Sequence, residues 1–190
     1  MNKYKKVFES ERIYYIKITK DLIDDYLNMI NDIEVANKIS HNPKTFTYED
    51  ELKWVESNLR ENTIIFSMIE KNTEEYIGNV EIMHINDKRI GEVGICITAS
   101  KQNQHYGTEA MEAIIKYGIE KIGLSGLELN VYKTNPRAIR CYEKVGFAQD
   151  GIGKTKEDIH MIYKKTKQYK KWGDKNDKRW WQIQNIKRIL

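Results

Sequence analysis

The spacing of the hydrophobic residues changes along the chain and predicts which segments are helices. After Thr19, a residue type that often caps a helix, apolar side chains recur every three or four positions, as they do along one helix face. The same spacing follows Thr47, and a long apolar stripe begins near Gly107. The predicted helices follow Thr19, cover residues 34–39, follow Thr47, and cover residues 107–117 and 135–145.

Segments with alternating or continuous apolar residues between polar turns predict strands. Polar turns such as residues 72–75 and 86–88 separate several of them. The predicted strands are residues 13–18, 63–70, 76–85, 90–98, 127–132, 147–151 and 159–164. Helices and strands are interspersed without repeats or an internal linker, which predicts one mixed α/β domain.

The composition fits a folded domain. The chain has 190 residues, of which 40% are hydrophobic and only two are proline, enough for a hydrophobic core. Two cysteines, Cys96 and Cys141, are too few for a disulfide framework, so we expect reduced thiols and no metal site. The charged N-terminus lacks a signal-peptide core, and no run approaches the roughly 20 apolar residues of a membrane helix. We therefore expect a cytoplasmic protein with no membrane partner.

Charge is unevenly distributed. Residues 164–190 hold ten Lys or Arg against two Asp, a net charge of +8, and because the whole chain carries +4, residues 1–163 carry −4. An acidic body attracts cations over long distances, which favours a cationic ligand. A bias of this size is also common on surfaces that bind nothing charged.

The C-terminal extension, residues 166–190, has a composition of its own. Trp172, Trp180 and Trp181 stand among lysines, and the apolar residues from Trp181 to Leu190 have the spacing of an amphipathic helix. The favoured interpretation is a helix that docks on residues 1–165 or on a second subunit of a homodimer. Basic and aromatic residues together also suit contact with RNA or the ribosome, through phosphate pairing and base stacking.

Residues 135–147 carry the most specific motif. Asn135 is a good N-cap, Pro136 suits the first helical position, and Gly146 suits the left-handed residue after a helix. Tyr142 lies on the apolar face of this predicted helix. The local pattern leaves two interpretations of Tyr142, a packed amphipathic residue or a proton donor, and by itself favours the packed residue.

A second segment precedes this motif. Residues 91–97 alternate like a strand, residues 98–106 are polar, and a long helix starts near Gly107. The unpaired N–H groups of a first helical turn and the helix dipole both favour an anion. This turn therefore suits a phosphate or pyrophosphate.

Together the two segments resemble the GNAT superfamily of acetyl-CoA-dependent N-acetyltransferases, in particular the branch with the Rim-type protein N-terminal acetyltransferases and the spermidine acetyltransferases. The resemblance spans about residues 10–165. It implies a GNAT domain over residues 1–165, with a central mixed, mostly antiparallel sheet of six to seven strands flanked by helices. It also implies acetyl-CoA as cosubstrate. The chain matches the family pattern N-x-x-A-x-x-x-Y-x-x-x-G-F at Asn135, Ala138, Tyr142, Gly146 and Phe147.

The resemblance also implies a pyrophosphate loop, Gln/Arg-x-x-Gly-x-Gly/Ala, before the long helix. With Gly107 at its last position, Gln102 fills the first, and His105 stands where the family has a glycine. A register that starts at Gln104 puts Glu109 at the small position and is less favoured. If the backbone at His105 is helical, the histidine costs little and its protonated ring adds a phosphate contact. The alternative interpretation of His105 is a solvated loop residue.

The resemblance implies the other coenzyme contacts. Ile95, Cys96 and Ile97 would face the pantetheine arm, and Asn135 would touch the coenzyme besides capping its helix. The loop contacts would be Gln102, Asn103, Gln104, His105, Tyr106, Gly107 and Thr108.

Amine acetylation requires a proton acceptor and a proton donor. An alkyl ammonium with a pKa of about 10.4 must lose a proton before it attacks a thioester, and the departing thiolate must gain one. Glu92 stands where many relatives place a glutamate and is the candidate base, with a water relay and a solvated Glu92 as the alternative. The complete family motif favours Tyr142 as the proton donor.

No motif specifies the acceptor. Its pocket is expected between residues 32–60 and the loop at residues 153–158, with Glu34 and Trp54 as candidate contacts beside Glu92. The leading hypothesis is acetyl transfer to a primary amine of a small cationic molecule or of a protein N-terminus. The alternatives are a non-catalytic coenzyme A-binding domain and a ribosome- or RNA-associated module acting through the C-terminal tail.

Overall fold

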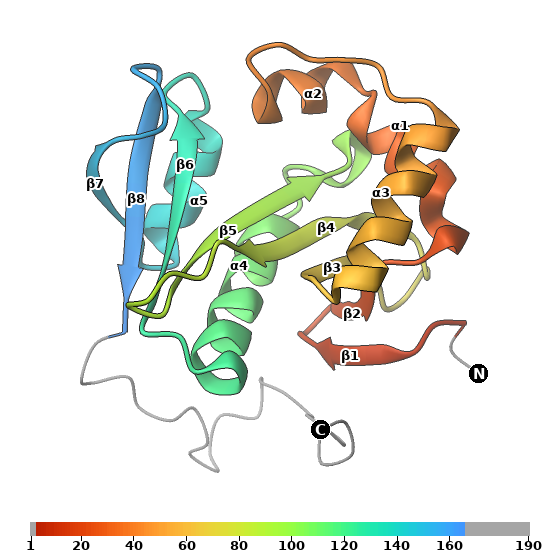
Figure 1. The fold of residues 1–190 in the computed structure, drawn as a ribbon, viewed down its shortest axis with the longest axis horizontal. Helices are drawn as coiled ribbons and strands as arrows, with labels where there is room; N and C mark the ends of the chain where they lie inside the picture. Colours follow the sequence, from red (N-terminus) through yellow and green to blue (C-terminus); the bar gives the residue numbers. More distant parts are fainter. Residues whose placement is uncertain (1–2, 166–190) are drawn as a thin grey trace.

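The computed structural model describes residues 3–165, which form one eight-stranded sheet covered by helices (Figure 1). The order across the sheet is β1-β2-β3-β4-β5-β6-β8-β7, and every neighbouring pair is antiparallel except β5 and β6. The strands are β1 (Lys6–Glu9), β2 (Ile13–Lys17), β3 (Ile64–Glu70), β4 (Tyr76–Met83), β5 (Ile90–Ile97), β6 (Gly126–Tyr132), β7 (Ala148–Ile152) and β8 (Asp158–Lys164).

Within residues 3–165, five α-helices connect the strands: α1 (Ile23–Ile30), α2 (Ile33–Ile39), α3 (Tyr48–Glu61), α4 (Tyr106–Lys116) and α5 (Pro136–Lys144). Short 3-10 helices cover Lys20–Leu22 and Ala99–Lys101, and α4 continues into a π-helical turn at Tyr117–Ile122. The side chains that the sequence predicts as helix caps, Thr19, Thr47 and Asn135, accept hydrogen bonds from the first turns of their helices. Thr47 and Asp50 make a reciprocal capping box at α3, which satisfies N–H groups that the helix leaves unpaired.

The expected α/β class and mostly antiparallel sheet are confirmed, but the sheet has eight strands where we expected six to seven. The additional strand is β1, whose residues pair with β2 from Glu9↔Tyr14 to Lys6↔Ile16. Four residues with a lysine and a glutamate at the ends carry too little alternation to predict a strand. The helix expected after Thr19 begins as a 3-10 turn before α1.

Helices cover both faces of the sheet, so a central strand such as β2 is buried on both sides. Its first four residues are all buried, because alternate side chains enter two different cores. Ile13 and Tyr15 belong to the core under α4, whereas Tyr14 and Ile16 belong to the core under α1 and α3. Figure 1 shows α4 on one side of the strands and α1 to α3 on the other.

The sheet opens between β5 and β6. These strands pair in parallel only at residues 90–92 of β5, from Ile90↔Gly126 to Glu92↔Glu128. Beyond that point β5 stays paired with β4 as far as Ile97, while β6 stays paired with β8 as far as Tyr132. The two strands therefore diverge, as Figure 1 shows, and residues 93–97 present a backbone edge that pairs with no strand of the described chain.

Some sequence-based expectations concern residues that the structure does not describe. The helical tail at 166–190, its docking in a homodimer and its contact with RNA or the ribosome all fall outside residues 3–165. Within residues 3–165, no helix has the length and apolarity needed to span a bilayer.

Candidate active site

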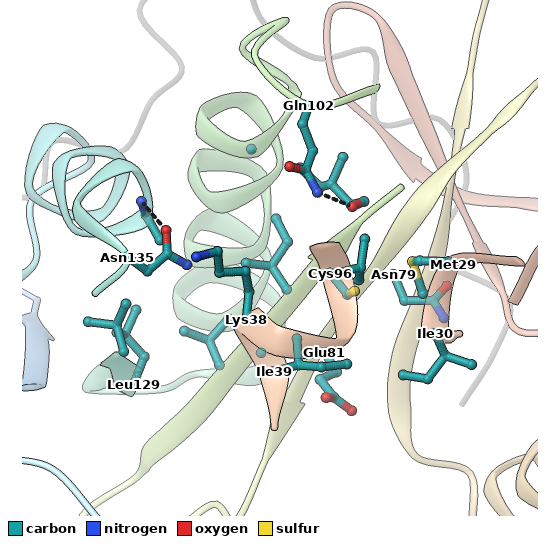
Figure 2. A pocket seen from close by; sticks show the side chains of 18 of the residues that line it. Met29, Ile30, Lys38, Ile39, Asn79, Glu81, Cys96, Gln102, Leu129 and Asn135 are labelled. Atoms are coloured by element: carbon teal, nitrogen blue, oxygen red, sulfur yellow. Dashed lines mark hydrogen bonds between the residues drawn. The ribbon is translucent and has the colours of Figure 1, made fainter. Parts of the chain in front are cut away.

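A cavity of about 1170 Å³ follows the opening between β5 and β6 and reaches both faces of the sheet. One half lies against the N-terminal ends of α4 and α5, and the other lies under α1, α2 and α3. Figure 2 shows Asn79, Glu81 and Cys96 on its wall beside Met29, Ile30 and Ile39. The divergence of the two strands thus produces one continuous space with two differently lined halves.

Helix α5 forms as its sequence predicts. The Asn135 side chain accepts a hydrogen bond from the Ala138 N–H at 3.2 Å, Pro136 occupies the first turn, and Gly146 adopts a left-handed φ of 98°. Tyr142 is half-buried, packs its ring 6.1 Å from that of Phe147 and lines the cavity. Burial raises the pKa of Tyr142, so the phenol stays protonated near neutral pH.

The loop before α4 contains left-handed backbone at two non-glycine residues, Asn103 with φ 61° and His105 with φ 66°. His105 is therefore not helical, and the condition under which it would cost little is not met. A left-handed residue other than glycine costs about 1–2 kcal/mol, and this explains why a glycine suits the position. In return, the turn lets α4 start at Tyr106 with the N–H groups of Tyr106, Gly107 and Thr108 unpaired within the helix.

Side-chain hydrogen bonds attach this loop to three other segments. The Gln102 side chain donates to the Ile97 carbonyl at 2.9 Å, and Arg137 of α5 donates to the Asn103 side chain at 3.2 Å. From the other side, Arg12 donates to the Gln104 carbonyl at 3.0 Å. The loop is thus attached to β5, to α5 and to the start of β2.

Glu109 decides between the two registers considered for the loop. It lies inside α4, is buried, and accepts hydrogen bonds from the Ser10 hydroxyl at 2.6 Å and the Arg12 backbone N–H at 2.7 Å. Glu109 therefore faces the β1–β2 end of the sheet and does not line the cavity, whereas Gly107 does. This arrangement favours the register that begins at Gln102.

The coenzyme-binding predictions fall on the cavity wall with one exception. Ile95, Cys96, Ile97, Gln102, Asn103, His105, Tyr106, Gly107, Thr108, Asn135 and Tyr142 all line it, whereas Gln104 does not. The Gln104 side chain instead donates to the Ser100 carbonyl at 2.8 Å. Three basic residues that were not predicted from the sequence line the same half and favour anionic ligands: Arg137, Arg140 and Lys144.

Strand alternation separates the three β5 residues expected at the pantetheine arm. Ile95 and Ile97 pack against the core under α4, while Cys96 packs against the core under α1 and α3. Burial, with a smaller contribution from the Glu81 carboxylate, raises the pKa of Cys96 to about 12. The Cys96 thiol is therefore protonated at neutral pH and a poor nucleophile.

Glu92 lies in the cavity, but three partners hold its carboxylate. It accepts hydrogen bonds from Lys154 at 2.6 Å and Asn130 at 3.4 Å, and it pairs with the His84 ring at 2.9 Å. Burial raises the pKa of Glu92, but the Lys154 and His84 contacts together lower it below its ordinary value. A carboxylate stabilised in its charged form is a weak base.

Glu81, a carboxylate on the strand beside that of Glu92, was not predicted as a site residue from the sequence. Glu81 lies on the same face of β4 as Asn79, and its oxygen lies 2.8 Å from where a side chain on Gly94 would begin. No hydrogen bond or ion pair to the Glu81 carboxylate occurs within residues 3–165. Burial and, next, the negative charge of Glu92 raise the pKa of Glu81 above its ordinary value. The only sequence signal was its alternation with the buried Val80 and Ile82, which does not reveal which face holds a cavity.

The acceptor half is mostly apolar. Of the two helix residues predicted to contact the acceptor, only one lines this half. Trp54 of α3 lines the cavity, whereas Glu34 is exposed and lines a separate pocket of about 430 Å³ beside Asn135 and Arg137. Glu51 of α3 is buried on the cavity wall, and burial raises its pKa. Apolar residues of the wall in this half are Met29, Ile30, Val35, Ile39, Phe46 and Ile65.

Comparison with known proteins identifies the family. The family model described as "Acetyltransferase (GNAT) domain" matches residues 12–148, and the chain therefore belongs to the GNAT acetyltransferases. This confirms the resemblance carried by residues 135–147 and the assignment to the acyltransferase class of enzymes.

As for metals, residues 3–165 contain no group of three His, Cys, Asp or Glu side chains arranged to hold an ion.

Several relatives and solved structures are similar to the chain. The uncharacterized N-acetyltransferase YnaD of Bacillus subtilis is 26% identical over 120 residues, which cover 63% of this chain and 71% of YnaD. The spermidine N(1)-acetyltransferase of Escherichia coli is 36% identical over 78 residues, which are 40% of this chain and 42% of that protein. The chain thus matches less than half of the spermidine enzyme's length.

Two crystal structures share the fold. A GNAT-family acetyltransferase from Bacillus anthracis superposes with a TM-score of 0.74 at 21% identity, covering 83% of this chain and 97% of that chain. The spermidine N-acetyltransferase of Vibrio cholerae, in complex with CoA and spermine, superposes with a TM-score of 0.73 at 18% identity, covering 80% and 95%.

Proposed function

We propose that the protein transfers the acetyl group of acetyl-CoA to a primary amine by direct attack of the amine on the thioester. The observation that carries this proposal is the single cavity that joins the N-terminal ends of α4 and α5 to the space under α1 to α3. A cosubstrate and an acceptor that enter the two halves would meet beside the open edge of β5. Holding two reactants in such contact by itself accelerates their reaction strongly.

The half of the cavity at α4 suits coenzyme A. The free N–H groups of Tyr106, Gly107 and Thr108 would bind the pyrophosphate, with Arg137 and Arg140 nearby to balance its charge. Asn135 lines this half and would contact the coenzyme while it caps α5. The backbone edge of residues 93–97 that faces away from β4 would pair with the amide groups of the pantetheine arm and would polarise the thioester carbonyl.

The residues around the thioester position favour direct transfer. Burial raises the pKa of both Cys96 and Cys141, so neither thiol is activated to carry the acetyl group. Tyr142, kept protonated by its burial, would donate a proton to the departing thiolate. An amine that attacks the thioester directly needs no acyl-enzyme intermediate.

The acceptor half suits an amine carried on an alkyl chain. Its apolar wall would cover methylene groups, and the carboxylates of Glu51 and Glu81 would attract ammonium groups. The similarity to spermidine acetyltransferases supports a small cationic amine as the acceptor class. Trp54 would then contact the alkyl chain.

Thermal unfolding and a thiol-release assay test the proposal. Acetyl-CoA at one hundred times its dissociation constant adds about 2.7 kcal/mol to the folded state, which raises the melting temperature by several degrees. In the second assay, free thiol should appear on addition of spermidine, spermine or an alkyl monoamine. No shift at millimolar acetyl-CoA would contradict the proposal. A shift without thiol release across small amines, amino sugars and peptide N-termini would indicate a non-catalytic coenzyme-binding domain instead.

A further inference from the structure

Two carboxylates lie side by side on the acceptor face of the sheet, and their surroundings differ. Glu81 of β4 and Glu92 of β5 both line the cavity, and the charge of Glu92 acts on Glu81. Glu92 is bound by Lys154, His84 and Asn130. Glu81 has no such partner in the described chain, so its carboxylate is free to bind a ligand.

Glu81 also lies level with the part of β5 that no longer pairs with β6. Its partner across the β4–β5 ladder is Gly94, two residues beyond Glu92, where β5 has already separated from β6. Gly94 has no side chain, and a Cβ there would come within 2.8 Å of the Glu81 oxygen. The glycine therefore lets the carboxylate lie over the strand where a thioester would be polarised.

The reacting groups share one neighbourhood. Gly94 and Cys96 lie on the face of β5 that Glu81 shares, which adjoins the core under α1 and α3, whereas Tyr142 packs against the core under α4 on the other face. Glu81 and Tyr142 thus approach the same stretch of β5 from its two sides. Apolar side chains of Met29, Ile30 and Ile39 line the same half of the cavity as Glu81 (Figure 2).

We infer that Glu81, and not Glu92, accepts the proton of the attacking ammonium, while Glu92 with Lys154 sets the electrostatic field in which Glu81 works. This assignment rests on the proposed acetyl transfer. An unpaired carboxylate in an apolar cavity both attracts an ammonium and removes its proton, whereas a carboxylate already bound to a lysine does neither well.

The protons balance over one turnover. The ammonium gives one proton to Glu81, and the neutral nitrogen forms a bond to the carbonyl carbon of the thioester. The carbon–sulfur bond breaks, and the thiolate takes a proton from Tyr142. The nitrogen, now part of an amide, sheds its second proton, which restores the Tyr142 phenol. Glu81 releases its proton to water, so each acetyl transfer liberates one proton.

The direction of the Glu81 pKa shift supports this role. Burial and the charge of Glu92 raise its pKa, which makes it a stronger base, while nearby His84 acts in the opposite direction. Other titratable or charged groups of the acceptor half are Cys96 on β5, Lys38 on α2, Lys44 before α3, and Asp50, Glu51 and Lys53 on α3. The active form is ionised Glu81, so kcat/KM rises with pH through the pKa of Glu81.

The test compares the pH profiles of four proteins: the wild type and the variants Glu81→Gln, Glu92→Gln and Lys154→Ala. Glu81→Gln should lower kcat by about 100-fold or more and remove the acid limb of the kcat/KM profile. Glu92→Gln removes a negative charge beside Glu81 and should move the acid limb to lower pH. Lys154→Ala removes the positive charge that balances the Glu92 carboxylate and should move the acid limb to higher pH. The acetyl-CoA-induced melting shift should persist in all of them.

The outcomes separate this assignment from the proposed function. An acid limb that persists in Glu81→Gln and vanishes in Glu92→Gln would overturn the assignment while acetyl transfer stands. If Glu81→Gln does not fold, the opposite shifts of the other two variants decide, and shifts in the same direction would contradict the assignment. A wild-type protein that releases no thiol with any amine would contradict the proposed function, and the role of Glu81 with it.

Discussion

Arg12 binds the carboxylate of Glu109 through its Nε atom at 2.8 Å, and the pair joins the start of β2 to the interior of α4. A second nitrogen of the same guanidinium donates to the Gln104 carbonyl, and the Cζ atom of Arg12 lies 4.3 Å from the centre of the Tyr106 ring. Arg12 therefore positions the loop whose N–H groups would bind the coenzyme pyrophosphate, although it does not line the cavity.

Arg12→Lys keeps the charge but cannot form both hydrogen bonds at once. We expect KM for acetyl-CoA to rise about tenfold, since one hydrogen bond to a charged group is worth about 1.5–3 kcal/mol, with kcat changed less than twofold. Steady-state kinetics measures both. Arg60→Lys at the exposed end of α3 is the matched control. An equal fall of kcat in Arg12→Lys would show that Arg12 does more than position the loop.

The left-handed backbone of His105 predicts a difference between two small replacements. Glycine adopts a φ of 66° without steric cost, whereas alanine keeps the Cβ clash. We expect His105→Gly to be more stable to urea than His105→Ala by about 1 kcal/mol. Equal stability of the two variants would mean that the backbone strain is relieved in another way. A comparison of their KM values for acetyl-CoA separately reports whether the imidazole contacts phosphate.

Removal of one hydroxyl tests Tyr142. Tyr142→Phe keeps the ring that packs near Phe147 and should lower kcat by about 100-fold, the scale of a lost proton donor, with an unchanged acetyl-CoA melting shift. Tyr163→Phe is the control, because its ring contacts the same Phe147 at 5.7 Å. If kcat of Tyr142→Phe equals that of the wild type, Tyr142 is a packing residue and not the proton donor.

Glu70 links stability to pH. Hydrogen bonds from Lys101 and then Tyr106 lower the pKa of Glu70 from 4.5 to about 2. Because the folded-state pKa lies below the ordinary value, this contribution is present above about pH 4.5 and is lost as the pH falls toward 2. Glu70→Gln should therefore lower the melting temperature at pH 7 and converge with the wild type near pH 2. The exposed Glu49→Gln, whose partner is Lys53, should show little difference at either pH.

Most of the fold follows from local signals. The strands lie within two residues of their expected limits, because alternation and polar turns mark them directly. Helix α5 begins and ends as predicted, since its caps at Asn135 and Gly146 are set by adjacent residues. The short strand β1 was missed because its pairing with β2, rather than its own sequence, makes it a strand.

The sequence by itself determined the family, because the Asn135 to Phe147 motif is a continuous segment whose helix caps are set by adjacent residues. It also named most residues of the proposed coenzyme half, whereas the conformation of the loop before α4 depends on Arg12 and Arg137 from other segments. Only the tertiary structure separated Glu81 from Glu92. Both are alternating polar residues of strands, and what distinguishes them is a lysine from the loop after β7 and a glycine across the ladder. The strength of a base depends on such neighbours, which lie far away in the sequence and meet only in the folded chain.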